Sequence, residues 1–207
     1  MQKTIDFTYH LHQSITHKQA YDEWAITHDE EVMAVNYRAP YSVALEAIKV
    51  CPSGIFLDIG CGTGLVAESI RSNCSETVVL DGCDASKGML RIASEKKIYR
   101  SLVNCDIHAM PFAAASYDLI TAAGVLVGSK DRQLAGNPDH RAIPEIARLI
   151  KPNGFFVFTV SCRVWETDHK DYKAAIADCQ FKHINCIERP YHDVIPTAMY
   201  FVLQKKS

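Results

Sequence analysis

The stretch LDIGCGTG (57–64) places three glycines within five positions, directly after an apolar run. Glycines this dense indicate a backbone that turns tightly or approaches another group closely. The dinucleotide fingerprint G-x-G-x-x-G requires its third glycine where Leu65 stands here. Asp58 precedes the first glycine, where an acid repels a pyrophosphate but attracts an ammonium or sulfonium group. This charge argument disfavours NAD and favours a cofactor that carries positive charge.

Apolar, β-branched runs alternate with helical runs along most of the chain. Ser86 is a suitable N-cap, Pro40 suits a first helical turn, and KPNG (151–154) is a turn in which Asn-Gly can take positive φ. The pattern predicts helical segments within 18–50, strands at 55–59, 77–83, 99–105, 117–126 and 155–160, helices at 65–73, 86–97, 140–150 and 171–180, and two last strands near 181–189 and 198–204.

Strands that alternate with helices form right-handed βαβ units, which build a mainly parallel sheet covered on both faces. The last two strands are joined by a short loop without a helix, so we expect an antiparallel hairpin at one edge of the sheet. The chain of 207 residues fits a single domain. We therefore predict an α/β fold with a three-layer, doubly wound, mainly parallel seven-stranded sheet. Residues 1–50 would form a helical N-terminal extension and residues 51–207 the core.

The pattern D-x-G-x-G-x-G resembles the cofactor loop of class I S-adenosylmethionine-dependent methyltransferases. Asn153 departs from the family's R-x-L-K-P-G-G turn, but asparagine tolerates positive φ. The resemblance covers about residues 20–160 and implies a Rossmann-like methyltransferase fold with S-adenosyl-L-methionine as cofactor. Four later segments match the family's elements in the family's order: GCDAS (82–86) with Met89-Leu90, NCDI (104–107) with MPF (110–112), SYDLI (116–120) and RLIKPNG (148–154).

Three further segments are more particular. YDxWA (21–25), YRAP (37–40) and AIPE (142–145) resemble the Williams–Beuren region methyltransferase-like proteins. This second resemblance adds a class of protein and no substrate.

The resemblance implies a set of cofactor-binding residues at the carboxyl ends of the strands, where open α/β sheets bind ligands. The acid at the end of the second strand, Asp84, would accept hydrogen bonds from the ribose hydroxyls. Asp106 would face the adenine amino group, and the apolar Ile107 would lie on the ring. The complete set is Tyr37, Arg38, Asp58, Gly60, Cys61, Gly62, Gly64, Asp84, Ala85, Met89, Asp106, Ile107, Ala123 and Gly124.

Several of these residues have a structural alternative. Asp58 and Asp84 are also suited to capping the helices that follow them, and Asp106 to a solvated loop. Arg38 could clamp the cofactor's carboxylate, with Tyr21 and Tyr37 roofing the methyl group, or these side chains could pack an amphipathic helix.

Two residues near the loop and strands are interpreted more simply. Cys61 is expected because it is small, since no adjacent histidine supports a nucleophile. Asp118 lies at the end of its strand away from the cofactor, which favours a structural role.

Methyl transfer from a sulfonium is an in-line displacement at an activated carbon, so the protein must mainly align the nucleophile and exclude water. A general base is needed only if the nucleophile must lose a proton. We hypothesise that His192 is this base; His108, His140 and Glu145 are the other candidates.

Composition narrows the partners. A net charge of −2 and a pI near 6.5 give no general attraction to nucleic acid or anionic lipid. The N-terminus lacks the apolar core of a signal peptide, and no apolar run approaches the roughly 20 residues that span a bilayer. The eight cysteines never form C-x-x-C, and the histidines lack metal-ligand spacing. We therefore expect a reduced, cytoplasmic protein without a metal, a nucleic-acid partner or a membrane anchor.

The expected function is methyl transfer from S-adenosylmethionine to a small molecule, with residues 128–140 and the N-terminal helices covering the substrate. A protein substrate is one alternative. A catalytically silent module that binds adenosylmethionine, or nothing, and serves a partner is another, and an NAD oxidoreductase is a third. The acceptor atom and the oligomeric state stay open.

Overall fold

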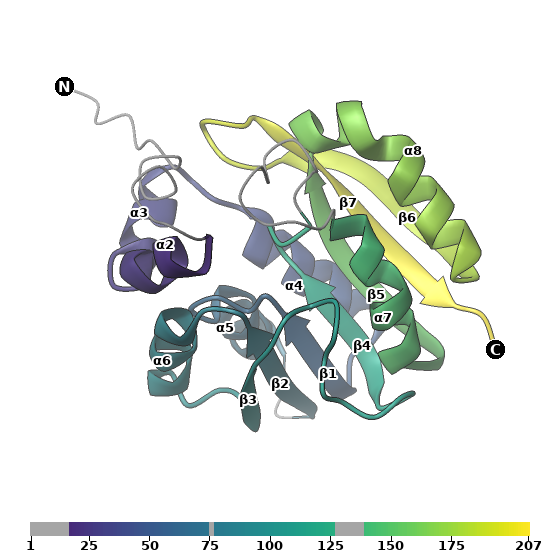
Figure 1. The fold of residues 1–207 in the computed structure, drawn as a ribbon, viewed down its shortest axis with the longest axis horizontal. Helices are drawn as coiled ribbons and strands as arrows, with labels where there is room; N and C mark the ends of the chain where they lie inside the picture. Colours follow the sequence, from purple (N-terminus) through teal and green to yellow (C-terminus); the bar gives the residue numbers. More distant parts are fainter. Residues whose placement is uncertain (1–16, 75–76, 127–138) are drawn as a thin grey trace.

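The computed structural model describes residues 17–74, 77–126 and 139–207. One seven-stranded sheet has the order β3-β2-β1-β4-β5-β7-β6 (Figure 1). Neighbours among the first five strands in this order run parallel, and β7 runs antiparallel between β5 and β6. The predicted α/β fold with an antiparallel C-terminal hairpin is therefore confirmed. The strands are β1 (Gly54–Ile59), β2 (Val78–Asp84), β3 (Ser101–Asn104), β4 (Tyr117–Ala122), β5 (Ile150–Ser161), β6 (Phe181–Pro190) and β7 (Thr197–Lys205).

Helices cover both faces of this sheet. Successive side chains of a strand point to opposite faces. Phe56 and Leu57 of β1, both fully buried, therefore enter two different apolar clusters. The cluster around Phe56 is covered by α4 (Ala39–Val50) and α5 (Leu65–Asn73). The cluster around Leu57 is covered by α7 (Ile143–Leu149) and α8 (Cys162–Asp178), as Figure 1 shows.

The first two described helices lie outside these layers. α2 (His17–Trp24) and α3 (His28–Ala34) stand beside α6 (Lys87–Glu95) in Figure 1. Trp24, Ala25 and Val32 form a third apolar cluster with Met89 of α6. Gly88 allows this close approach, because a Cβ there would lie 2.6 Å from the carbonyl oxygen of Asp22. We call α2 and α3 the N-terminal cap; α4 belongs to the core layer.

Element boundaries differ from the sequence predictions in several places, among them the end of β4 and the start of α8. β4 ends at Ala122 rather than at 126, because the chain turns at Gly124, whose φ is 70°. α8 begins at Cys162 rather than at 171, with the Ser161 side chain accepting a hydrogen bond from the amide of Val164. Its buried stripe includes Asp168, and that charged residue hid the helical periodicity from sequence inspection.

Other local predictions hold. The Ser86 hydroxyl accepts from the amide of Met89 as an N-cap, and Pro40 lies in the first turn of α4. Asn153 has a φ of 62°, as the KPNG turn required, although the turn falls within β5. The predicted helix at 140–150 is split into a 3-10 turn, η1 (Asp139–Ala142), followed by α7.

Candidate active site

A cavity of about 460 Å³ opens at the carboxyl ends of the parallel strands. Strand order reverses between β1 and β4, the position at which open α/β sheets bind ligands. The walls of the cavity come from the segments after β1, β2, β3 and β4, from the N-terminal cap and from the loop between β6 and β7. The volume suits a cofactor-sized ligand.

The glycine loop forms one side of this cavity. Gly60, Gly62 and Gly64 all have positive φ, at 56°, 54° and 96°. A Cβ on Gly60 would lie 2.5 Å from a methyl group of Val125, so the protein's own packing requires that glycine. A Cβ on Gly62 would meet nothing within 4 Å and would enter open space. Gly62 therefore leaves room for a group that approaches the backbone from the cavity.

Asp84, at the end of β2, fixes the glycine loop in place. Its two carboxylate oxygens accept hydrogen bonds from the amides of Gly62 and Ser86, each at 2.8 Å. Burial raises the pKa of this carboxyl, while the two amide hydrogen bonds act in the opposite direction. The side chain also lines the cavity, so the structural role and a ligand-facing position coincide.

Asp106, beyond β3, lies at the more open end of the cavity. Its side chain is 71% exposed, and its Oδ1 contacts the Nδ1 of His108 at 2.7 Å and accepts from the His108 amide. Ile107 beside it is buried against the main core cluster and lines the cavity. A solvated acid next to an apolar wall is suited to a flat heterocycle with an exocyclic donor.

Asp58 does not line the cavity. The residue is 1% exposed, and its carboxylate accepts from the hydroxyls of Tyr99 at 2.7 Å and Thr121 at 2.8 Å. Burial raises its pKa to about 6. It does not cap α5, whose N-cap residue is Gly64 without a side-chain cap. Asp58 instead braces β1 against β4 beneath the glycine loop.

Arg38 also lies outside the cavity. Its exposed side chain lines a separate groove with Met33, Tyr41 and Arg189. Its amide donates to the carbonyl of Tyr191, and the chain then enters α4, so Tyr37 faces the cavity and Arg38 faces away from it. This geometry does not bring the guanidinium to a cofactor carboxylate.

An aromatic cluster closes the end of the cavity opposite Asp106. Tyr37 meets Tyr191 edge to face with ring centroids 5.3 Å apart. His192 lies against both rings, with centroids at 6.1 Å from Tyr37 and 4.8 Å from Tyr191. Gly124 makes room for this cluster, because a Cβ there would lie 2.3 Å from the Tyr37 hydroxyl.

Two carboxylates that sequence reasoning missed attach the N-terminal cap to α6 and to the glycine loop. Asp22 accepts from the hydroxyl of Ser86 at 2.6 Å and the amide of Gly88 at 2.7 Å, at the start of α6. Asp29 binds Lys96 at 2.8 Å and the hydroxyl of Thr63 within the glycine loop. The signal for Asp22 lay in the segment YDxWA, but its partner 64 residues away was not visible.

Most predicted site residues meet in this cavity, while Arg38, Asp58 and Gly64 do not line it. Glu145 binds Arg148 and the amide of Met110, and His140 packs against Tyr172, so neither faces the cavity. Residues 127–138, and with them nearly all of the predicted cover at 128–140, lie outside the described residues. The cavity-lining members of the predicted set are Tyr37, Gly60, Cys61, Gly62, Asp84, Ala85, Met89, Asp106, Ile107, Ala123, Gly124 and His192.

Residues 57–158, from the end of β1 into β5, match the family described as the methyltransferase domain. This match, the sheet order and the loop identify a class I S-adenosylmethionine-dependent methyltransferase domain. The cofactor of this class is S-adenosylmethionine, as the resemblance implied.

Particular relatives refine the class. Human methyltransferase-like protein 27 is 32% identical over 164 residues, which cover 76% of this chain and 63% of that protein. The ubiquinone/menaquinone biosynthesis C-methyltransferase UbiE of Geotalea daltonii is 31% identical over 117 residues, covering 54% and 47% of the two chains. The chain thus spans less than two thirds of either relative.

Solved structures share the fold at lower identity. A chain from the complex of the Haloferax volcanii Trm112 methyltransferase activator with a methyltransferase has a TM-score of 0.68 and 18% identity, covering 90% of this chain and 98% of its own. The N-methyltransferase NodS of Bradyrhizobium japonicum, in complex with S-adenosyl-L-homocysteine, has a TM-score of 0.63 and 18% identity, covering 82% and 87%.

The residues present fit this cofactor. Open space at Gly62 accepts a closely approaching ligand, and the acids Asp84 and Asp106 offer oxygens to hydroxyl and amino donors.

Within the described ranges, no helix is long and apolar enough to cross a membrane.

Proposed function

We propose that the protein transfers a methyl group from S-adenosylmethionine to a small-molecule acceptor. One observation carries this proposal: a single cavity runs from the glycine loop to the Tyr37–Tyr191–His192 cluster and has the N-terminal cap as one wall. A covered cavity of this kind suits an acceptor that can be enclosed with the cofactor and shielded from water.

In this proposal the chain's own residues bind and align. Asp84 accepts from the ribose hydroxyls, and Asp106 with Ile107 holds the adenine. The bound cofactor supplies a methyl carbon that is already activated towards a nucleophile. The aromatic cluster and the neighbouring Val125, Leu126 and Ile195 hold the acceptor in line and keep water away.

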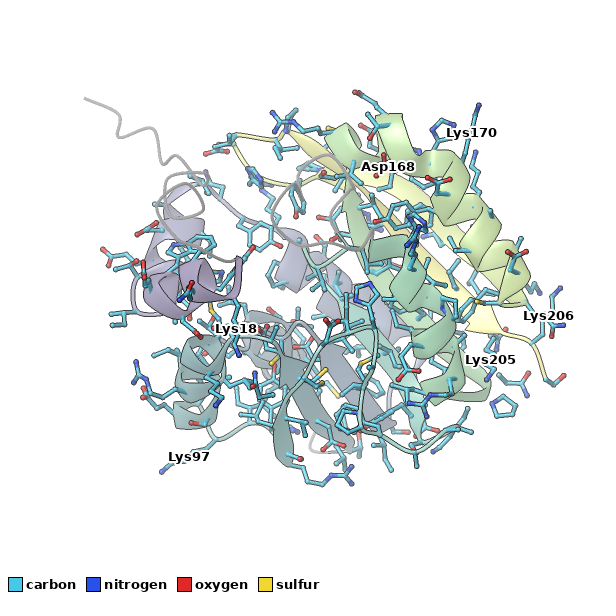
Figure 2. All side chains as sticks on the ribbon, in the orientation of Figure 1. Lys18, Lys97, Asp168, Lys170, Lys205 and Lys206 are labelled. Atoms are coloured by element: carbon cyan, nitrogen blue, oxygen red, sulfur yellow. The ribbon has the colours of Figure 1, made fainter. Side chains whose placement is uncertain are left out.

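Charge distribution supports a small molecule over nucleic acid. Lys96 is paired with Asp29 and Glu68, and Lys205 donates to the carbonyls of Ala147 and Ile150. Figure 2 shows Lys97 and Lys206 at opposite edges of the molecule, so these basic pairs do not form one patch. Lys18, which lines the cavity, lies between α2 and α6 in the same view.

A protein partner is a second candidate, favoured by one observation. The fold neighbour from the Haloferax volcanii complex was solved together with a methyltransferase activator. A chain of this fold could likewise work with a small activating protein, and its acceptor could be a protein. Cytoplasmic location stays a prediction, as does the division into an extension and a core, although α4, within the predicted extension, packs in the core layer.

Calorimetry with S-adenosylmethionine, S-adenosylhomocysteine and NAD tests the cofactor, and formation of S-adenosylhomocysteine from a small-metabolite pool tests the acceptor. We expect binding of the first two ligands and turnover on a small-molecule fraction. Binding of NAD alone would overturn the proposal. Binding without turnover on small molecules, but with turnover on a protein fraction, would favour the second candidate. Binding without any turnover would indicate a silent module.

A further inference from the structure

His192 sits in the short loop between β6 and β7 and lines the cavity beside Tyr37 and Tyr191. The loop is held in place from several sides. The amide of His192 donates to the carbonyl of Ile195, the amide of Tyr191 donates to that of Pro196, and the amide of Asp193 donates to that of Val35. The imidazole is therefore presented by a fixed backbone and not by a free side chain.

Two backbone amides determine which ring nitrogen carries the proton. The Nδ1 atom of His192 accepts from the amide of Val194 at 3.1 Å and from the amide of Ile195 at 3.0 Å. A nitrogen that accepts hydrogen bonds carries no hydrogen, so the neutral ring has its proton on Nε2. Protonation of Nδ1 would place its new hydrogen against the hydrogens of these two amides.

The surroundings keep the ring neutral. Burial lowers the pKa of His192, and the carboxylate of Asp193 offsets this only in part. Among the described residues, the tyrosines Tyr37 and Tyr191 also face the ring. Burial raises both tyrosine pKa values, that of Tyr191 to about 12, so both hydroxyls stay protonated at neutral pH.

We infer that His192 is a hydrogen-bond donor to the methyl acceptor through Nε2–H, and not the general base. A donor at this position recognises an oxygen lone pair. The acceptor that fits is a compound with a carbonyl-type, enolate or phenolate oxygen, which would accept the hydrogen bond from Nε2–H. Its nucleophilic atom lies next to this oxygen and needs no deprotonation, because His192 is not a base. This inference rests on the proposed function and replaces the base role that the sequence suggested for His192.

The tautomer is tested without any acceptor. Protein labelled with ¹⁵N-histidine is saturated with S-adenosylhomocysteine, and long-range ¹H–¹⁵N spectra distinguish the two neutral tautomers and the imidazolium. His192→Gln identifies the signal by its disappearance. We expect the Nε2–H tautomer at pH 7–8. An Nδ1–H tautomer, or an imidazolium at pH 7, would overturn the inference.

The role is tested with matched variants on the acceptor that the turnover assay identifies. Gln places an amide donor near the former Nε2, Asn places it near the former Nδ1, and Phe keeps the ring shape without a donor. We expect kcat/KM within about threefold of wild type for His192→Gln and about tenfold lower for His192→Asn and His192→Phe. A fall of about a hundredfold or more in all three, with loss of the acidic limb of the pH profile, would identify a base. If no acceptor is turned over, the proposed function fails while the spectra still decide the tautomer.

Discussion

The two halves of the cavity are built in opposite ways. The cofactor half, with Asp84, Asp106 and the glycine loop at 60–64, comes from the ends of successive strands and is tied by backbone amides. The acceptor half joins Tyr37, near the start of the chain, to Tyr191 and His192, near its end. The first is local in sequence and the second depends on contacts between distant segments.

The halves also differ in charge. Two acids, Asp58 and Asp84, lie within or beneath the cofactor half, and burial raises the pKa of each. The aromatic cluster of the acceptor half presents groups that are neutral at pH 7. This division suits a cationic cofactor on one side and an acceptor recognised by hydrogen bonds on the other.

Removal of the Asp84 side chain should have the largest effect of these variants on cofactor binding, because it disrupts the cofactor half. Asp84→Ala loses two charge-assisted bonds that hold the loop and the acid that would face the ribose. We expect the dissociation constant for S-adenosylmethionine to rise about a hundredfold in calorimetry. Asp118→Asn is the matched control at the opposite end of the sheet, where Asp118 binds Lys151, and it should stay within about twofold. Equal losses in both variants would mean that Asp84 acts only through the fold.

Asp58 makes the free energy of unfolding depend on pH through the cofactor half. Its folded pKa of about 6 lies above the unfolded value of about 3.9, so the folded state binds the proton more tightly. The contribution of Asp58 to the free energy of unfolding should therefore fall by about 2 kcal/mol as pH rises from about 4 to about 6, and level off near pH 7. Because carboxyls with lowered pKa values, such as Asp29, change stability in the opposite sense, the difference in free energy of unfolding between wild type and Asp58→Asn should show this fall in denaturant titrations. A parallel pH dependence in both proteins would contradict the assignment.

Two glycine variants separate the halves directly. Gly62→Ala places a methyl group in the open space of the cofactor half, and we expect about tenfold weaker S-adenosylmethionine binding. Gly124→Ala drives a methyl group against the Tyr37 hydroxyl, and we expect about tenfold lower turnover with cofactor affinity within about threefold. Calorimetry and turnover on the same preparations provide the comparison. The distinction between the halves fails if each variant lowers S-adenosylmethionine affinity and turnover to the same extent.

The smallest expected effect concerns the N-terminal cap. Hydrogen bonds from His28, Lys96 and Thr63 hold the pKa of Asp29 below its usual range, although burial alone would raise it. Asp29→Asn should weaken cofactor binding about fivefold and speed proteolysis near residues 17–34. Glu95→Gln, which breaks the exposed Arg91–Glu95 pair on α6, should change neither. Unchanged proteolysis in Asp29→Asn would show that Asp29 does not hold the cap.

Sequence reasoning reached the cofactor half more fully than the acceptor half. Gly62 and Asp84 follow strands that are evident from apolar runs, so their meeting at one sheet edge could be predicted. Arg38 could not be placed, because a helix start turns Tyr37 inward and Arg38 outward. The attachment of Asp22 to Ser86 and Gly88 was equally invisible, since nothing local marks its partner.

His192 shows the same limit at the level of a single atom. Its position in the short loop could be expected, but its tautomer is set by the amides of Val194 and Ile195 folding back on Nδ1.

The sequence by itself determined the α/β sheet, the positive φ of the glycine loop and the acids at the strand ends. These follow from short-range periodicity and backbone sterics, which act within a few residues. Only the tertiary structure decided that Asp58 is a buried brace, that α2 and α3 cap the cavity, and that Tyr37 meets Tyr191. Those outcomes depend on packing between segments far apart in the chain, where burial and hydrogen-bond partners are set by the whole fold and not by neighbouring residues.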